Sequence, residues 1–326
     1  MNLGFWGKLQ PKADPPRAGK KPIICQAPMA DVTDAAFRQM IAKYGKPDVM
    51  WTEFISADGL CSVGKKKLLH LLKFSEKERP IVAQLFGAKP ETMRCAAALV
   101  VKLGFDGIDI NMGCPDRAVE KQGGGAALIK NPKLAREIIR AAKAGVESSD
   151  RRIPVSVKTR IGYNKNELAS WLPELLAENL AAIIIHTRTR KELSNVPARW
   201  EHIREAVAIR NQLKSKTLII GNGDVADLTD AYEKVKMSGA DGIMIGRAFF
   251  GKPWLLSDFS SLNLSILLEH TKLFNKLLGK HKNFAVMKKH FKAYINGFSG
   301  AKELRIKLMA TKNVAEVEEI LKTWNH

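Results

Sequence analysis

The chain has 326 residues, enough for one large domain and a smaller one, and 45% of them are apolar, which supports a well-filled core. Lysine and arginine number 53 against 33 acidic residues, a net charge of +20, so we expect a polyanionic partner. Nucleic acid is the first candidate and an anionic membrane surface the second, with a generally basic protein as the remaining alternative. No apolar run reaches the roughly eighteen residues of a membrane span, and the N-terminus lacks the apolar region of a secretory signal.

The four cysteines contain no CxxC pair, so the sequence predicts no metal site and no disulfide framework. A reducing cytoplasm is the compartment that fits this cysteine usage.

Residues 1–22 are expected to form a basic N-terminal arm. The stretch 10–22 is rich in proline, lysine and arginine, a composition typical of a linker. We predict no function for this arm.

From residue 23 onward, short apolar runs alternate with helical patterns. The helical patterns include 34–44, closed by Gly45, and 90–103, closed by Gly104. Eight fully apolar strands alternating with helices predict a (β/α)₈ TIM barrel over residues 23–256; a doubly wound sheet is the alternative. The strands are expected at 23–27, 49–55, 81–86, 107–110, 155–159, 182–185, 217–220 and 242–245.

Polar residues collect where these strands end, and in a barrel such ends meet at one mouth. The fourth strand stops at Asn111-Met112-Gly113-Cys114-Pro115, which puts a thiol at the position where barrel enzymes keep their chemistry. A buried, inert Cys114 is the alternative. The glycines at 123–125 would let the backbone approach a ligand closely, before a helical pattern begins at residue 126.

The last two strand ends predict a phosphate site. Loops after the seventh and eighth strands commonly bind phosphate in barrels of this kind. The segments Gly221-Asn222-Gly223 and Gly246-Arg247 suit that role, and Lys158 on the fifth strand could reach the far end of a bound cofactor. A phosphate-bearing, electron-accepting ring beside Cys114 suggests FMN. No GxGxxG motif indicates a Rossmann domain.

After residue 256 the alternation ends, and residues 257–326 predict a small C-terminal helical domain of about four helices. Asn313 and Glu316 resemble a capping box for the last helix. Six lysines and no acidic residue stand between His270 and Phe291, a pattern more typical of a phosphate-binding face than of a solvated one.

Several motifs together resemble the tRNA-dihydrouridine synthases, and most of all the bacterial branch similar to the B-type enzymes. The resemblance extends over residues 23–322, and the arm at 10–20 is not part of it. The motifs, in the family's order, are Ala27-Pro28-Met29-Ala30, Ala83-Gln84-Leu85-Phe86-Gly87, Asn111-Met112-Gly113-Cys114-Pro115, Val157-Lys158-Thr159-Arg160, Ile185-His186-Thr187-Arg188-Thr189, Gly221-Asn222-Gly223-Asp224 and Gly246-Arg247.

The resemblance implies an FMN-binding barrel and a tRNA-binding helical domain in a monomeric, cytoplasmic enzyme that uses NADPH or NADH. Hydride would pass from reduced flavin to C6 of uracil, and Cys114 would protonate C5 as general acid. The implied cofactor contacts are Pro28, Met29, Ala30, Gln84, Lys158, His186, Asn222, Gly223, Asp224, Gly246 and Arg247. Asn111 would contact the uracil and Arg188 either cofactor or RNA, while Lys282, Lys288 and Lys289 would contact tRNA.

Two other functions are compatible with parts of the pattern. An FMN barrel that acts on a small molecule, such as a dihydroorotate-type oxidoreductase, would share the phosphate loops but leave the +20 charge and the basic tail unexplained. A non-catalytic RNA-binding protein would have no need for Cys114, Lys158 and Arg247 together.

Overall fold

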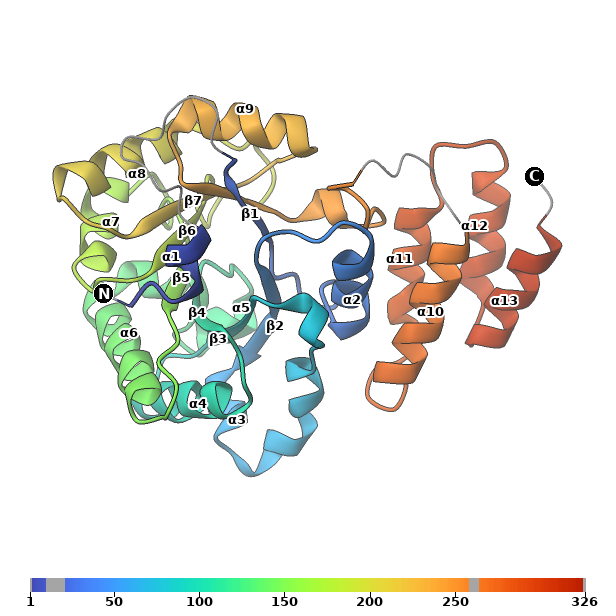
Figure 1. Ribbon diagram of the computed structural model, residues 1–326, viewed down its shortest axis with the longest axis horizontal. Coiled ribbons are helices and arrows are strands. Elements are labelled where there is room, and N and C mark those ends of the chain that lie inside the picture. The colour runs from blue at the N-terminus through green and yellow to red at the C-terminus, as the bar shows by residue number, and fades with distance from the viewer. Residues whose placement is uncertain (1, 10–20, 258–263, 325–326) are drawn as a thin grey trace.

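The computed structural model describes residues 2–9, 21–257 and 264–324. Within these residues, eight parallel strands form a sheet in the order β1-β8-β7-β6-β5-β4-β3-β2. A parallel bridge between Cys25 and Val49 joins β1 to the start of β2, and Gln26 N–H donates to the Val49 carbonyl at 3.0 Å, so the sheet curls around to meet itself. The predicted TIM barrel is confirmed (Figure 1).

Each strand coincides with a predicted apolar run to within two residues at either end. Parallel strands are covered on both faces, so nearly every side chain is apolar and the runs are recognisable in the sequence. The strands are β1 Ile23–Gln26, β2 Met50–Ser56, β3 Ile81–Phe86, β4 Gly107–Met112, β5 Val155–Arg160, β6 Ala182–His186, β7 Leu218–Asn222 and β8 Gly242–Ile245.

Helices cover the outside of the barrel. Their ends follow local chemistry: Asp34 caps α2 by accepting from Phe37 N–H at 3.0 Å, and Gly239, with φ 73°, ends α9 in the left-handed conformation. The helical pattern expected from residue 126 is a 3₁₀ helix, η4 (Gly125–Lys130). The helices are α2 Ala35–Tyr44, α3 Ala57–Leu60, α4 Pro90–Lys102, α5 Arg117–Lys121, α6 Pro132–Glu147, α7 Leu168–Leu176, α8 Glu201–Gln212 and α9 Leu228–Ser238.

Residues 2–9 pack against the barrel, so the prediction of an arm over residues 1–22 is wrong for this part. The short helix α1 (Phe5–Leu9) buries Trp6, whose ring lies 6.0 Å from that of Trp51. Trp6 belongs to the cluster that fills the barrel interior together with Ile23 and Leu218, at the starts of β1 and β7. Leu3, Phe5 and Leu9 pack against the same cluster, and the burial of these apolar side chains with Trp6 anchors the segment. The proline-rich stretch 10–20 lies outside the described residues.

Cys61 and Cys95 form a disulfide, which corrects the expectation of no disulfide. Cys61 directly follows α3 and Cys95 lies in α4, and these two helices pack together with the two cysteine Cα atoms 6.3 Å apart. The partners are 34 residues apart in the sequence, and only the packing of α3 on α4 brings them together. Cys25 and Cys114 are free.

Four helices in the described residues form the small C-terminal helical domain, at the right of Figure 1. As predicted, Asn313 caps the last helix by accepting from Glu316 N–H at 3.0 Å. The helices are α10 Leu264–Leu278, α11 Val286–Tyr294, α12 Ala301–Ala310 and α13 Val314–Thr323.

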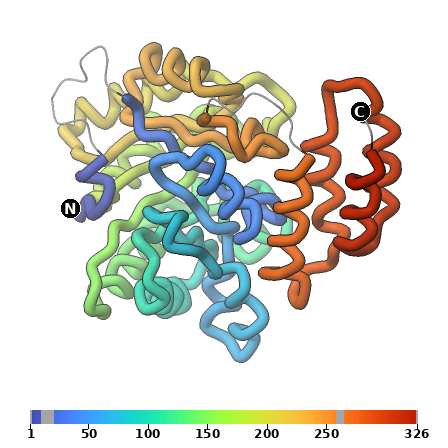
Figure 2. Tube along the Cα trace, turned by 45° about the vertical axis from the view of Figure 1, so that its right-hand side comes forward, coloured from blue at the N-terminus to red at the C-terminus, as the bar shows by residue number. Residues whose placement is uncertain are grey.

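The helical domain is docked on the barrel through α2. Helix α10 packs along α2, as Figures 1 and 2 both show. The ring of Phe37 on α2 lies 5.3 Å from that of His270 and 5.0 Å from that of His290. Burial lowers the pKa of both histidines, so they are neutral members of an apolar interface.

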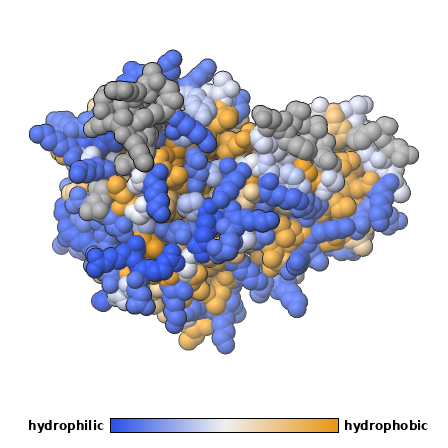
Figure 3. Space-filling view, viewed as in Figure 1, coloured by the Kyte–Doolittle hydropathy of each residue, from blue (hydrophilic) through white to orange (hydrophobic). Residues whose placement is uncertain are grey.

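The face drawn in Figure 3 is mixed: hydrophilic side chains dominate at the left, over the barrel, and hydrophobic side chains are prominent over the helical domain at the right. None of the helices in the described ranges combines the length and apolar character needed to cross a membrane.

Candidate active site at the barrel mouth

A free thiol lies in the loop after β4. The Asn111 side-chain oxygen accepts hydrogen bonds from the N–H groups of Gly113 (3.1 Å) and Cys114 (2.8 Å), which turns the chain out of the strand. The Cys114 carbonyl in turn accepts from Ala126 N–H at 3.0 Å. Gly125 has φ 59°, and a Cβ there would lie 2.7 Å from the Cys114 carbonyl oxygen. This glycine therefore serves the close packing of the Cys114 loop, whereas we expected the glycine run to face a ligand.

The Cys114 thiol is half-buried, and burial raises its pKa above the ordinary value. A cysteine with a raised pKa stays protonated at neutral pH. The side chain is thus a thiol that can donate a proton rather than a thiolate nucleophile.

Behind Cys114, buried polar side chains from three strands form a continuous hydrogen-bonded chain. Ser156 Oγ and Gln84 Nε2 donate to the two carboxylate oxygens of Asp109, each at 2.7 Å. Asn111 Nδ2 donates to Gln84 Oε1 at 3.0 Å. Burial raises the pKa of Asp109 to about 6. The chain fixes the orientation of Asn111, and each carboxamide has a second N–H that can serve a ligand.

Lys158, on β5, points into the mouth and donates to Asn222 Oδ1 at 3.0 Å. Asn222 is itself held by its Nδ2, which donates to the Met244 carbonyl at 2.8 Å. Burial, and next the guanidinium of Arg160, lower the pKa of Lys158 to about 8. The ammonium therefore has a neutral hydrogen-bond partner, and the repulsion by Arg160 exceeds the attraction by Asp109, an arrangement that an anionic or electron-rich ligand would stabilise.

Arg160 supports the Cys114 loop, a function the sequence analysis did not assign. Its Nε donates to the Gly113 carbonyl at 2.8 Å, and its Nη1 donates to the carbonyls of Thr189 and Leu193 at 3.0 and 3.1 Å. It therefore ties the Cys114 loop to the loop after β6. The sequence could have shown that Arg160 lies at the mouth, because residues 158 and 160 are two apart on one strand and their side chains therefore share its face.

The ends of β6, β7 and β8 bring together the residues predicted for the phosphate end. Asp224 pairs with both Arg188 and Arg247 and accepts from Ala198 N–H at 2.9 Å. Arg188 is buried, and its Nη1 lies 3.3 Å from His186 Nε2. Arg188 thus organises this corner of the mouth through Asp224, while Arg247 remains exposed to a ligand.

This corner has the properties of an anion cradle. Burial, followed by Lys158 and three arginines, holds the pKa of His186 well below its ordinary value, which reports a concentration of positive charge. Gly223 has φ 132°, and a Cβ there would lie 2.8 Å from Thr187 Oγ1 and 3.3 Å from the His186 ring, so a side chain would fill the cradle. Cations around glycine backbone suit a phosphate group. No cluster of metal-ligating side chains occurs among the described residues.

The loop after β1 lies against the loop after β8. A Cβ at Gly246 would lie 3.6 Å from the Met29 sulfur. Pro28 and Met29 are half-exposed and Ala30 is exposed, and Met29 N–H donates to Thr33 Oγ1 at 2.8 Å. These residues are therefore presented at the mouth, beside the anion cradle.

The three lysines assigned to tRNA contacts do not lie in equivalent places. Lys288 and Lys289 are half-buried on α11. Lys282 instead reaches the barrel, where its ammonium pairs with Glu53 at 3.0 Å and Asp31 at 3.1 Å. The expectation that Lys282 belongs to a free phosphate-binding face needs correction, because the acidic partners come from β2 and the β1 loop rather than from its own sequence neighbourhood.

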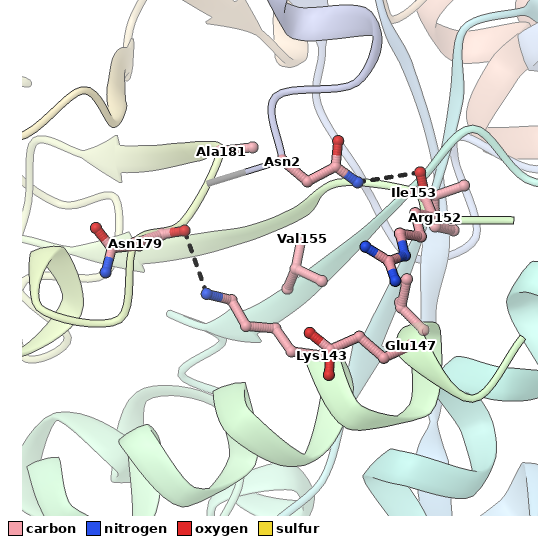
Figure 4. A pocket seen from close by; sticks show the side chains of 9 residues that line it. Asn2, Lys143, Glu147, Arg152, Ile153, Val155, Asn179 and Ala181 are labelled. Carbon is pink, nitrogen blue, oxygen red and sulfur yellow. Dashed lines mark hydrogen bonds between the residues drawn. The ribbon is translucent and has the colours of Figure 1, made fainter.

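A cavity of about 510 Å³ lies at the opposite end of the barrel, lined by Asn2, Lys143 and Asn179 among others (Figure 4). Its polar groups are largely used within the protein: Asn2 Nδ2 donates to the Arg152 carbonyl at 3.0 Å, and Lys143 Nζ donates to the Asn179 carbonyl at 3.2 Å. Val155, at the start of β5, lines it as well. Residues at this end of a barrel serve stability rather than chemistry.

Comparison with known proteins gives the fold and the family. The solved structures of histamine dehydrogenase from Rhizobium sp. 4-9 and of morphinone reductase share the fold at 14% identity, with TM-scores of 0.53 and 0.50. The matches cover 77% and 74% of this chain, and 49% and 88% of theirs.

Two curated bacterial proteins are similar over nearly their whole length. The probable tRNA-dihydrouridine synthase of Staphylococcus aureus (strain COL) is 40% identical over 98% of this chain and 95% of its own. The probable tRNA-dihydrouridine synthase 2 of Bacillus subtilis (strain 168) is 40% identical over 98% and 96%. The model of the dihydrouridine synthase (Dus) family matches residues 25–325. The chain therefore belongs to the dihydrouridine synthase family.

Proposed function

We propose that this protein reduces uridines in tRNA to 5,6-dihydrouridine, with FMN as cofactor and NADPH or NADH as reductant. One observation carries the proposal: a protonated, half-buried Cys114 thiol shares the barrel mouth with a glycine-lined cationic cradle, in a chain of this family. A proton donor and an anion site at one mouth are the two elements that flavin-dependent reduction of a carbon–carbon double bond requires.

The cofactor would be held by residues on six of the strands or in the loops that follow them. Gly223 and Gly246 leave room for backbone contacts with the phosphate, and His186 and Arg247 line the cradle, with Arg247 held in place by Asp224. Pro28, Met29 and Ala30 would lie against the ring, with Gln84, Lys158 and Asn222 at its polar edge. When bound and reduced, FMN supplies the hydride that is added at C6 of the uracil.

The protein's own chemical contribution is the proton. Cys114 would donate it to C5 of the uracil, which needs a thiol whose pKa has not been lowered. Asn111 has two functions: its oxygen shapes the Cys114 loop, and its second N–H can donate to the uracil. Arg160 holds the same loop from the other side through the Gly113 carbonyl.

A tRNA substrate accounts for the charge of +20. The target base has to leave its stack to reach the mouth, so the remainder of the RNA must be held on a wider surface. Lys288 and Lys289 on α11 are proposed phosphate contacts. The connection between β2 and β3 adds Lys65, Lys66 and Lys67 on η1 (Val63–Lys67). We further propose that the enzyme acts as a monomer in the cytoplasm.

The test uses tRNA from a strain that lacks the gene. Each uridine position is compared with the parent strain, and with the deletion strain complemented by the gene, by mass spectrometry of dihydrouridine. The proposal expects dihydrouridine to be lost at one or more positions and restored by complementation. Unchanged tRNA in a strain with no second family member would contradict it.

A further inference from the structure

The ion pairs of Lys282 connect the helical domain to the loop that lines the proposed flavin site. Lys282 lies in the turn between α10 and α11, and only 9% of its side chain is exposed. Its ammonium lies 3.0 and 3.1 Å from the two oxygens of Glu53 and 3.1 Å from Asp31 Oδ1. A buried ammonium with two carboxylate partners is held far more firmly than an exposed lysine.

Glu53 transmits this contact to the backbone of the β1 loop. It is 4% exposed within β2, and its Oε1 accepts the N–H of Asp31 at 2.5 Å. Asp31 has φ 55°, in the left-handed region, which aspartate adopts more readily than most residues and which the hydrogen bond to Glu53 stabilises. The two carboxylates thus depend on Lys282 for charge compensation, and the loop depends on Glu53 for its shape.

Asp31 directly follows Pro28, Met29 and Ala30. Within this loop, Thr33 Oγ1 accepts from Met29 N–H at 2.8 Å, and Thr33 N–H donates to the Met29 carbonyl at 2.9 Å. The segment 29–33 is therefore one compact turn, and a change at Asp31 moves Met29 with it.

We propose that Lys282 is a positioning residue: by docking the helical domain on Glu53 and Asp31, it sets the conformation of the β1 loop against the flavin. The inference rests on the proposed function, because it assumes that FMN lies against Met29. It makes the RNA-binding domain a structural part of the cofactor site. Lys282 then affects uridine reduction without contacting RNA.

The test measures FMN binding to the full-length holoprotein in the absence of RNA. Lys282→Met removes the charge and keeps a long apolar stem. FMN dissociation is followed by flavin fluorescence, and the environment of the ring by circular dichroism of the visible flavin bands. We expect FMN to bind roughly tenfold more weakly, the size of a coupling between contacting residues, and the dichroism to change.

Three further variants separate positioning from other functions. Lys280→Met, two residues away and exposed, should leave both FMN signals unchanged. Lys282→Arg, which keeps the charge, should retain FMN. Combining Lys282→Met with Glu53→Gln should restore much of the affinity, because Glu53, the buried carboxylate that pairs directly with Lys282, is then neutral.

Each other outcome overturns the inference. Unchanged FMN signals with weaker tRNA binding would make Lys282 an RNA contact, and unchanged FMN signals with only a lower melting temperature would make it a structural residue. If Lys282→Met does not fold, Asp31→Asn applies the same test. This variant removes the ion pair between Lys282 and the exposed Asp31 but keeps the buried ion pair between Lys282 and Glu53. Unchanged dichroism of the flavin bands in this variant then overturns the inference. A wild-type protein that binds no flavin would instead refute the proposed function.

Discussion

Burial shifts the pKa values of Cys114 and Lys158, two of the titratable side chains at the barrel mouth, in opposite directions. It raises the pKa of Cys114 and so keeps the thiol protonated, and it lowers the pKa of Lys158 to about 8. In both cases the neutral form is favoured by removal from water. The same environment thus prepares a proton donor and a cation whose charge responds to a ligand.

The first prediction concerns the pH dependence of FMN binding. Lys158 is charged below its pKa of about 8 and loses its proton as the pH rises through that value. If the charged form holds FMN, affinity is full below pH 8 and declines above it, by up to tenfold per pH unit. Titration of the protein with FMN between pH 6.5 and 9.5 measures this. Lys158→Met should abolish the decline, and equal wild-type affinity at both ends of the range would contradict the assignment.

At this scale the sequence predicted which residue types stand at the mouth but not what each one touches. Cys114, Lys158 and Arg247 were recognisable because they stand at the ends of apolar strands, where burying a polar or charged side chain without a partner is costly. The partners of Arg188 and Lys282 were not, since Asp224, Glu53 and Asp31 come from elements distant in the sequence. An ion pair between distant segments depends on how the elements pack, and no sequence pattern near either residue identifies its partner.

At the scale of the elements, the close packing of the Cys114 loop depends on one glycine. Gly125 combines a φ of 59° with a Cβ position 2.7 Å from the Cys114 carbonyl oxygen and 2.8 Å from Val119 Cγ1. Gly297 offers a matched comparison, because its φ is 77° but no heavy atom lies within 4 Å of the Cβ position.

The second prediction compares alanine at these two glycines. Gly297→Ala should lower the free energy of unfolding by about 1 kcal/mol, because alanine is strained in the left-handed conformation and nothing else opposes its methyl group. Gly125→Ala should cost a further 1–3 kcal/mol or so, because the added methyl group has no space, and should slow uridine reduction by moving Cys114. Chemical denaturation and turnover on tRNA measure the two effects. Equal losses for both variants would show that the Cys114 loop accommodates a side chain.

The sequence predicted the strands well, because each strand is buried on both of its faces. All eight strands coincide with apolar runs, because both faces of a parallel strand are covered. The prediction failed for α1, where one buried tryptophan anchors a short helix, and for the disulfide between Cys61 and Cys95. Neither has a period or a motif that a sequence alone displays.

At the scale of the whole molecule, a basic segment of the barrel reaches the helical domain. Lys65, Lys66 and Lys67 follow the end of β2 on the mouth side. Their connection touches the helical domain, since the rings of His70 and His281 stack 4.8 Å apart. The connection that carries these three lysines therefore reaches the turn that follows α10.

The third prediction is that these three lysines contact tRNA phosphates. Replacing them with glutamine should weaken tRNA binding and lower the slope of log affinity against log salt by up to roughly 0.9 per lysine, because fewer counterions are released. Lys214→Gln with Lys216→Gln is the control, since both exposed lysines precede β7 at the far end of the barrel. A salt slope that is equal in both variants would place the RNA elsewhere.

Net charge and the end of the strand alternation were sufficient to predict a polyanionic partner and a second, helical domain. They could not reveal that the helical domain supplies Lys282 to the barrel, because charge composition carries no information on pairing. The proposed function depends above all on Cys114 as the proton donor for a uridine in tRNA.

The most direct test separates flavin reduction from uridine reduction in purified wild-type and Cys114→Ala proteins. Flavin absorbance follows reduction by NADPH, and mass spectrometry counts the dihydrouridine formed in unmodified tRNA. The account predicts equal flavin reduction in both proteins, with dihydrouridine formation slowed by about 10²–10⁴-fold in the variant, the usual effect of losing a general acid. A variant that modifies tRNA within a few-fold of the wild-type rate, or a wild-type protein that forms no dihydrouridine, would contradict it.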